Sequence, residues 1–404
     1  MDQSPSWICC QLGAREHYAI PRALHQAHQL HQLITDAWVS PQSMLNWLPG
    51  RPLRSLCDRY HPNLANAPIT AFTPGLMGFE LQQRWQKTQP WDRMIARNQW
   101  FQTRAIKALQ TLSLPADQPP PVLFTYSYAA LELLRYGKSR GWPTVLGQID
   151  PGIMEEKIVQ AEFQKHPHLA PDWKPVPPSY WQTWQAECRL ADRIIVNSAW
   201  SRQLLEQAGV EPSKIDIVPL VYQPPPEAAN FVRTYPKAFT PDRPLRVLFL
   251  GLITLRKGIA ACLEAVEHLT GEPIEFWFVG PLEIEIPEHF RNHPQVKWTG
   301  PVPRSQTQHY YQQADVFLFP TLSDGFGLTQ LEAQAWGLPI IASQFCGEVV
   351  QPGKNGWILS QVSGSEIAST LSKRIHFSKQ LAEMTCCFNI TNKVKPINLT
   401  QLLS

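Results

Sequence analysis

The strongest constraint on the fold is the way in which apolar runs alternate with helix-like segments along most of the chain. From position 122 to 343, runs such as VLFTYSY, DRIIVNS, LRVLFLG and DVFLFP are almost continuously apolar, and segments with helical spacing lie between them. Strands of this kind are buried on both faces, which is typical of a parallel sheet covered by helices. The pattern predicts an α/β protein, and the lack of a short internal repeat argues against solenoids and propellers.

A proline-rich stretch divides this alternation into two halves. We predict an N-terminal domain over 1–222, a linker or hinge over 223–243, a C-terminal domain over 244–375 and a tail over 376–404. Each half has the strand and helix order of a doubly wound, Rossmann-like domain. The chain has 404 residues, which is enough for two separate cores.

Composition excludes several classes of protein. The formal net charge is only +3 and no long run of one sign occurs, so a nucleic-acid binder is not expected. The longest apolar stretch, Val247 to Leu255, is about half of what a membrane-spanning helix needs. The N-terminus lacks the basic start of a secretory signal, so we expect a cytoplasmic protein.

Metal and redox chemistry have no clear signature in the sequence. The eight cysteines show no C-x-x-C spacing, so reduced thiols are expected. No cluster of His, Cys or Asp has the spacing of metal ligands, and no clear D-x-D pair stands in a loop. We therefore expect no metal site and no cofactor.

The most informative local segment is PTLSDGFGLTQLEAQAWGLPIIAS, residues 320–343. A loop from Asp324 to Gly327 follows a predicted strand and opens a helix that carries Glu332. Such a helix start, at the carboxyl edge of a parallel sheet, offers free backbone N–H groups to an anion. A nucleotide phosphate fits this place, whereas the simpler reading is an ordinary turn followed by a surface glutamate.

The whole segment resembles the E-G-F-G-L-x-x-x-E-A-x-A-x-G-x-P-V-I-A-S signature of the retaining GT-B glycosyltransferases of family four, the glycosyl transferases group 1. FLGLITLRKGI at 249–259 and the stretch 189–222 also resemble that family, and the match is good over about 120–360. The resemblance implies two Rossmann-like domains that face each other across a cleft. It also implies a retaining, metal-independent hexosyl transfer from a nucleotide diphosphate sugar to a glycan, lipid or small-molecule acceptor.

The same resemblance implies roles for individual residues. Catalytic roles fall to Arg256 and Lys257, which would hold the donor diphosphate and stabilise the charge of the leaving group, and to Asp324, which would face the transferred sugar. Glu332 would accept hydrogen bonds from the ribose hydroxyls. The full donor-binding set is Gly251, Gly280, Val302, Phe326, Gly327, Leu328 and Glu332.

The first domain is expected to hold the acceptor. The loop QLGAREHY at 11–18 places Gly13, Arg15, His17 and Tyr18 toward the cleft, although His17 is as readily explained as a solvated loop histidine. Two departures from the family pattern stand out. Asp324 takes the place of a glutamate, with a turn-forming aspartate as the alternative, and Gln148 and Asp150 stand where the family often has a histidine.

Two further alternatives follow from the sequence. The departure at Asp324 and a tail without clear pattern are compatible with a catalytically silent nucleotide-binding scaffold of the same fold. The cationic helix Asp92 to Leu112 is compatible with peripheral contact with an anionic membrane, although a solvated helix with one buried face is favoured. The family resemblance also implies that the tail, residues 376–404, crosses back and packs on the first domain.

Overall fold

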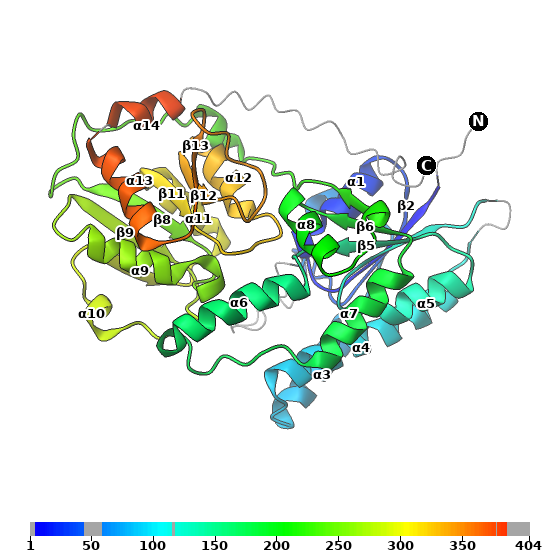
Figure 1. Ribbon diagram of the computed structural model, residues 1–404. Helices are drawn as coiled ribbons and strands as arrows, with labels where there is room; N and C mark the ends of the chain where they lie inside the picture. The colour runs from blue at the N-terminus through cyan, green and yellow to red at the C-terminus, as the bar shows by residue number, and fades with distance from the viewer. Residues whose placement is uncertain (1–4, 44–58, 115–117, 377, 386–404) are drawn as a thin grey trace.

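The N-terminal half is built on a sheet of seven parallel strands (Figure 1). The computed structural model describes residues 5–43, 59–114, 118–376 and 378–385. The strands are β1 (Trp7–Gln11), β2 (Leu30–Thr35), β3 (Ile69–Ala71), β4 (Val122–Tyr126), β5 (Thr144–Gln148), β6 (Arg193–Val196) and β7 (Ile215–Ile217). Their order is β3-β2-β1-β4-β5-β6-β7, so the winding reverses between β1 and β4, where parallel sheets commonly bind ligands.

The C-terminal half contains a second parallel sheet, of six strands. These are β8 (Leu245–Leu250), β9 (Ile274–Val279), β10 (Val296–Gly300), β11 (Val316–Phe319), β12 (Ile340–Ser343) and β13 (Gly356–Leu359). Their order is β10-β9-β8-β11-β12-β13, and here the winding reverses between β8 and β11. The two loops after these strands carry the predicted catalytic residues Arg256, Lys257 and Asp324.

Helices cover both sheets, as strands buried on both faces require. Those of the N-terminal half are α1 (Ala19–Gln26), α3 (Thr73–Trp85), α4 (Pro90–Gln110), α5 (Leu131–Ser139), α6 (Ile153–Lys165), α7 (Pro178–Leu190) and α8 (Ala199–Gln207). Those of the C-terminal half are α9 (Ile259–His268), α10 (Glu288–Arg291), α11 (Arg304–Gln313), α12 (Leu328–Ala335), α13 (Gly364–His376) and α14 (Ser378–Thr385). The predicted α/β architecture of two doubly wound sheets is confirmed.

Helix α6 connects the two halves. It begins next to the end of β5 in the N-terminal half and reaches across to the C-terminal half (Figure 1). Beyond its end, Leu169 is buried in the C-terminal core, and its carbonyl oxygen accepts a 2.8 Å hydrogen bond from the amide of Glu285. The first turn of α6 is therefore held beside the loops that follow β8 and β11.

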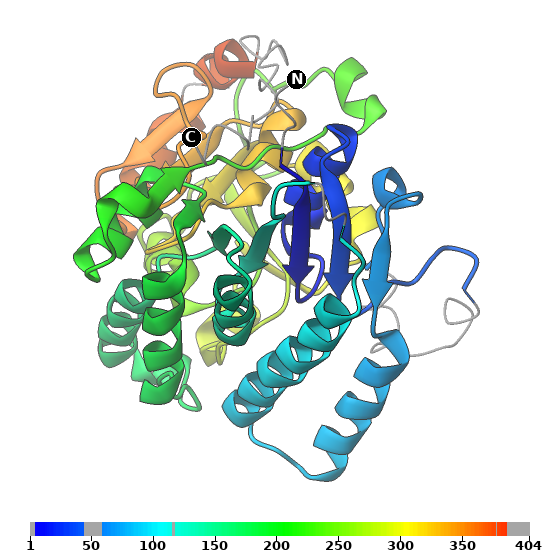
Figure 2. The same ribbon diagram turned by 90° about the vertical axis from the view of Figure 1, so that its right-hand side faces the viewer.

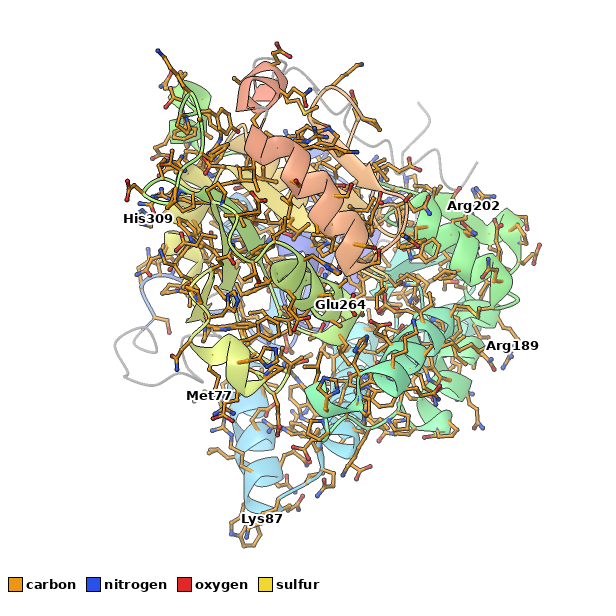
Figure 3. The ribbon with its side chains drawn as sticks, turned by 60° about the vertical axis from the view of Figure 1, so that its left-hand side comes forward. Met77, Lys87, Arg189, Arg202, Glu264 and His309 are labelled. Atoms are coloured by element: carbon orange, nitrogen blue, oxygen red, sulfur yellow. The ribbon has the colours of Figure 1, made fainter. Side chains whose placement is uncertain are left out.

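Helices α3 and α4 form a hairpin at the edge of the N-terminal half (Figure 2). The predicted helix Asp92 to Leu112 is confirmed as α4, and one face of it, with Phe101 and Leu109, is buried. Figure 3 shows Lys87 at the tip of the hairpin, away from both sheets. No helix in the described ranges is both long and apolar enough to cross a membrane.

The proline-rich segment 223–243 packs on the C-terminal half through its second part. Arg233 donates hydrogen bonds to backbone carbonyls at the ends of α11 and α12, among them those of Tyr311 (2.6 Å) and Trp336 (3.0 Å). Arg243 forms a two-pronged ion pair of 2.7 Å contacts with Asp315. Of the predicted tail, α14 packs on α13, and residues 386–404 lie outside the described residues.

Candidate active site

A cavity of about 420 Å³ lies between the two halves. Its C-terminal wall is formed by the loops that follow β8 and β11, and its N-terminal wall by residues next to the ends of β1, β5 and β6. Among the predicted residues, those that line it are Arg15, Gly251, Arg256, Lys257, Asp324, Phe326, Gly327 and Leu328. The structure thus brings the predicted catalytic residues and one acceptor-side residue to a single cavity.

A short helical turn positions Arg256 and Lys257. It spans Leu255–Lys257, and the Thr254 hydroxyl caps it by accepting a hydrogen bond from the Lys257 amide. Gly258 ends the turn with a φ of 79°, and a Cβ on it would lie 1.9 Å from the Pro320 carbonyl oxygen. Only glycine allows this approach, which places the turn against the loop after β11.

Both the backbone and the side chain of Arg256 form hydrogen bonds with the loop after β11. Its carbonyl oxygen accepts from the Leu322 amide at 2.9 Å, and its Nη1 donates to the Ser323 carbonyl oxygen at 2.9 Å. Two carboxylates lie near the same Nη1, with Asp324 Oδ2 at 3.6 Å and Glu155 Oε2 at 3.7 Å. Two cations and two carboxylates therefore share one partly enclosed space.

The ionisation of this group is strongly perturbed. Burial, reinforced by neighbouring Arg256, lowers the pKa of Lys257 to about 7, although its Nζ contacts the Asp324 carboxylate. Burial also raises the pKa of Glu155 to about 7, against the opposing charge of Arg256. Strong pKa shifts on cavity-lining side chains are typical of functional sites.

Asp324 both forms its own turn and contacts the cations. Its Oδ1 accepts a 3.2 Å hydrogen bond from the Phe326 amide, while its Oδ2 faces Lys257. Asp324 can therefore form its own turn and still present a carboxylate to the cavity. Gly327 follows with a φ of 87°, and a Cβ there would lie 2.5 Å from the Phe319 ring, so glycine is needed for α12 to begin where it does.

The other predicted donor residues, Glu332, Gly280 and Val302, do not line this cavity. Glu332 Oε2 accepts a 2.8 Å hydrogen bond from the Tyr311 hydroxyl, and its Oε1 lies 3.7 Å from Arg304 Nη2. A Cβ on Gly280 would lie 1.8 Å from the Gly251 carbonyl oxygen, so the ends of β8 and β9 pack closely there. Val302 is partly buried against the C-terminal core. Their roles toward base and ribose stay predictions.

The acceptor-side loop has an unusual backbone. Glu16, His17 and Tyr18 all have positive φ, between 51° and 59°, which costs energy in side-chain-bearing residues. Gly13 donates from its amide to Asp36 at 3.0 Å, and Arg15 faces the Tyr126 ring. His17 lines a neighbouring cavity instead of the donor cavity.

Three polar residues of the site were missed by sequence reasoning. Glu16 and Asn197 line the cavity from the N-terminal half, and the Asn197 side chain donates to Glu16 Oε1 at 2.6 Å. Asn197 follows β6 directly, so its place at a strand's carboxyl end was an available signal. Glu155 carried no such signal, because its position depends on α6 crossing to the other half. Gln148 and Asp150 instead bond to each other at 2.9 Å within the N-terminal half.

Within the part of the chain that the structure describes, no group of three His, Cys, Asp or Glu side chains could hold a metal ion. The charged groups at the cavity are those of Arg15, Glu16, Arg256, Lys257 and Asp324, with Glu155 behind them. Such an arrangement suits a ligand that carries its own negative charge.

Comparison with known proteins points to one class of enzyme. A family model described as Glycosyl transferases group 1 matches residues 244–376. Over 210 residues the chain is 24% identical to a putative colanic acid biosynthesis glycosyltransferase of Salmonella typhimurium, covering 48% of this chain and 50% of that protein. It is 29% identical over 200 residues to a D-inositol 3-phosphate glycosyltransferase of Nocardia farcinica, and the match covers 44% of this chain and 43% of that protein. The chain spans about half the length of such curated relatives.

Solved structures resemble the whole chain. HepE from Anabaena, in complex with UDP, gives a TM-score of 0.59 at 13% identity and covers 98% of both chains. Sucrose-phosphate synthase from Thermosynechococcus elongatus gives a TM-score of 0.58 at 16% identity, and the match covers 94% of this chain and 92% of the synthase. The architecture is the GT-B fold, as predicted.

Proposed function

We propose that the protein transfers a sugar from a nucleotide diphosphate donor to an acceptor, with retention of anomeric configuration and without a metal ion. The observation that carries this proposal is the cavity between the halves, where Arg256, Lys257 and the start of α12 face the same space. A diphosphate bound there would meet two cations and the free backbone N–H groups of a helix N-terminus.

The chemistry follows from where charge develops. When the bond between the anomeric carbon and the diphosphate oxygen breaks, negative charge grows on the diphosphate. Arg256 and Lys257 would stabilise that charge more in the transition state than in the ground state, which lowers the barrier. Fixed cations in this position supply what a divalent metal ion supplies in other glycosyltransferases, and this is the basis for proposing metal independence.

The N-terminal wall would receive the acceptor. Glu16 accepts hydrogen bonds from the Tyr126 hydroxyl at 2.8 Å and from Asn197 at 2.6 Å, so its carboxylate is fixed at the cavity edge. A carboxylate oxygen has a second lone pair, which leaves it free to accept a bond from an acceptor hydroxyl. The family resemblance is the support for retention, and the acceptor is a glycan, a lipid or a small molecule.

A test of the proposal uses the purified full chain and a panel of nucleotide sugars. UDP-glucose is a sound first donor, because HepE has been solved with it. Donors that bind should raise the unfolding temperature, and the best should be hydrolysed or transferred, with the product anomer read by NMR. Lys257→Ala should lower turnover by on the order of 100-fold, as loss of a charge-stabilising group does.

The matched control is Lys87→Ala, because Lys87 is exposed at the tip of the α3–α4 hairpin (Figure 3). It should leave turnover unchanged. If nucleotides bind but no donor is turned over with or without acceptor, the protein is a nucleotide-binding scaffold and the proposal fails. A product of inverted configuration would refute retention alone.

A further inference from the structure

A second cavity, of about 400 Å³, adjoins the donor cavity and shares Glu16 and Leu328 with it. Three basic side chains of the N-terminal half line it, those of His17, Arg22 and His61, and Arg304 enters from the start of α11 in the other half. Glu16 is the one acidic side chain among the described residues that line it. The charged side chains of the cavity at neutral pH are thus the two arginines and one glutamate, so positive charge is in excess.

Arg22 lacks an acidic partner within the described ranges of the chain. Its Nη1 reaches the His17 carbonyl oxygen at 3.5 Å, and its Nε is buried with no hydrogen-bond acceptor there. Glu16 forms no ion pair or hydrogen bond with Arg22, and its two carboxylate oxygens accept bonds from Tyr126 and Asn197 instead. A partly buried guanidinium with a buried, unpaired Nε and no counter-charge is costly, and an anion would reduce that cost.

Both imidazoles of this cavity offer a hydrogen-bond donor. Arg304 Nη1 lies 2.7 Å from His17 Nδ1 and can only donate, so Nδ1 accepts and the proton of the ring is on Nε2. His61 Nδ1 accepts from the Asn63 amide at 3.2 Å, with the same consequence. Burial, together with the neighbouring arginines, lowers the pKa of each ring to about 4, so both are neutral at pH 7.

We infer that this cavity is a subsite for an anionic group, a phosphate or a carboxylate, that the acceptor carries. The arginines Arg22 and Arg304 line the cavity together with the two histidines, and a guanidinium matches an oxyanion with paired donors. The assignment to the acceptor rests on the proposed function, because the donor diphosphate is expected at Arg256 and Lys257, on the other side of Leu328. An acceptor bound here would reach Glu16 with a hydroxyl.

The first experiment measures binding of simple anions to the full chain. Sulfate, phosphate and acetate are titrated in the presence of saturating UDP, and affinities are taken from the rise of the unfolding temperature. Arg22→Gln and His61→Gln should each weaken sulfate binding by about tenfold or more, since each removes a donor to a charged group. The matched control is Arg84→Gln, which removes an exposed cation of α3.

The outcomes separate the sources of the anion. Stronger binding of sulfate and phosphate than of acetate indicates a phosphorylated acceptor, and the reverse indicates a carboxylate. If UDP or Lys257→Ala abolishes sulfate binding, the anion occupies the donor site and the inference is wrong. Equal affinities in wild type, Arg22→Gln and His61→Gln also overturn it. Arg304→Gln serves as a further variant if Arg22→Gln does not fold.

The pH dependence provides a second readout. Sulfate keeps its double charge between about pH 5 and pH 8, so changes in its affinity report the protein. The two imidazoles face each other, Arg22 and Arg304, and the other ionisable side chains that line the cavity are Glu16, Tyr18, Tyr60 and Tyr222. A bound anion would raise the pKa of both rings. Sulfate affinity should therefore rise as the pH falls from 7 to 5, and this rise should be smaller in His61→Gln. A flat profile contradicts the inference.

Transfer assays distinguish this inference from the proposed function. A hexose phosphate and the same hexose are compared as acceptors, and Arg22→Gln should lower the preference for the phosphorylated form by about tenfold. If sulfate binding depends on Arg22 but no donor is transferred, the anion site is supported and the proposed transferase function is refuted. Transfer that shows no such preference, in a protein that binds no sulfate, would retain the transferase and refute the anion site.

Discussion

Raising the pH is expected to weaken nucleotide binding through a single ammonium group, that of Lys257. Burial holds its pKa at about 7 in the free protein, so the charged fraction falls tenfold for each pH unit above that value. A bound diphosphate needs the charged form and restores the pKa toward its ordinary range. Affinity should then fall tenfold per unit, about 1.4 kcal/mol, and about 100-fold from pH 7.5 to pH 9.5.

The assay is calorimetric titration of UDP across this range. The range begins near pH 7.5 because the terminal phosphate is fully ionised there and because Glu155, with a pKa of about 7, is mostly ionised. Titrations in buffers of different ionisation enthalpy should show uptake of close to one proton. Lys257→Arg is the matched control, since a guanidinium stays charged throughout and its affinity should change little with pH.

A flat affinity profile without proton uptake would refute this reasoning. It would mean that the contact between Lys257 and the Asp324 carboxylate outweighs burial and keeps the ammonium charged. Asp324→Asn then decides between the two effects. If the contact dominates, this variant should acquire the pH dependence that the wild type lacks.

Three further predictions concern other parts of the molecule. Glu332→Ala should weaken UDP binding by about 1 to 3 kcal/mol in calorimetry, because the ribose hydroxyls lose a charged acceptor. Asp324→Ala should act mainly on turnover, and equal losses of UDP binding in the two variants would show that the roles are misassigned. Arg233→Met should lower the free energy of unfolding by about 3 kcal/mol or more in denaturant titrations, because several carbonyls at two helix ends lose their donor, and an unchanged midpoint would contradict that role. Transfer should survive EDTA, and loss of activity that Mn²⁺ or Mg²⁺ restores would count against the fixed cations.

The sequence predicted the elements whose pattern is local. Continuous apolar runs identified most strands of both sheets, and the glycines at 258 and 327 mark turns whose φ values only glycine adopts easily. The pair Arg256 and Lys257 was predicted from the resemblance of residues 249–259 to a known family. In contrast, β3 and α3 were not predicted, because β3 has three residues and the α3 pattern is weakly periodic.

Site residues that depend on long-range packing escaped prediction. Glu155 belongs to a helix of the N-terminal half, and nothing near it in sequence indicates that it lies 3.7 Å from Arg256. Glu16 stands in a loop that was expected to face the cleft. Three successive residues with positive φ, Glu16 to Tyr18, set the directions of the side chains in this loop. Such a backbone is held by the surrounding fold and leaves little trace in the local sequence.

The anchoring of the proline-rich segment determines where the chain bends if the two halves move. Val218 belongs to the N-terminal core, while Ala228 and Arg233 are already fixed on the C-terminal half. In addition to the crossing at α6, one connection between the halves therefore lies in the few residues between them, and residues 221–224 of this stretch form one wall of the cavity that Arg22 lines. A molecule bound in that cavity would contact this connection, so its binding would depend on how the two halves are placed.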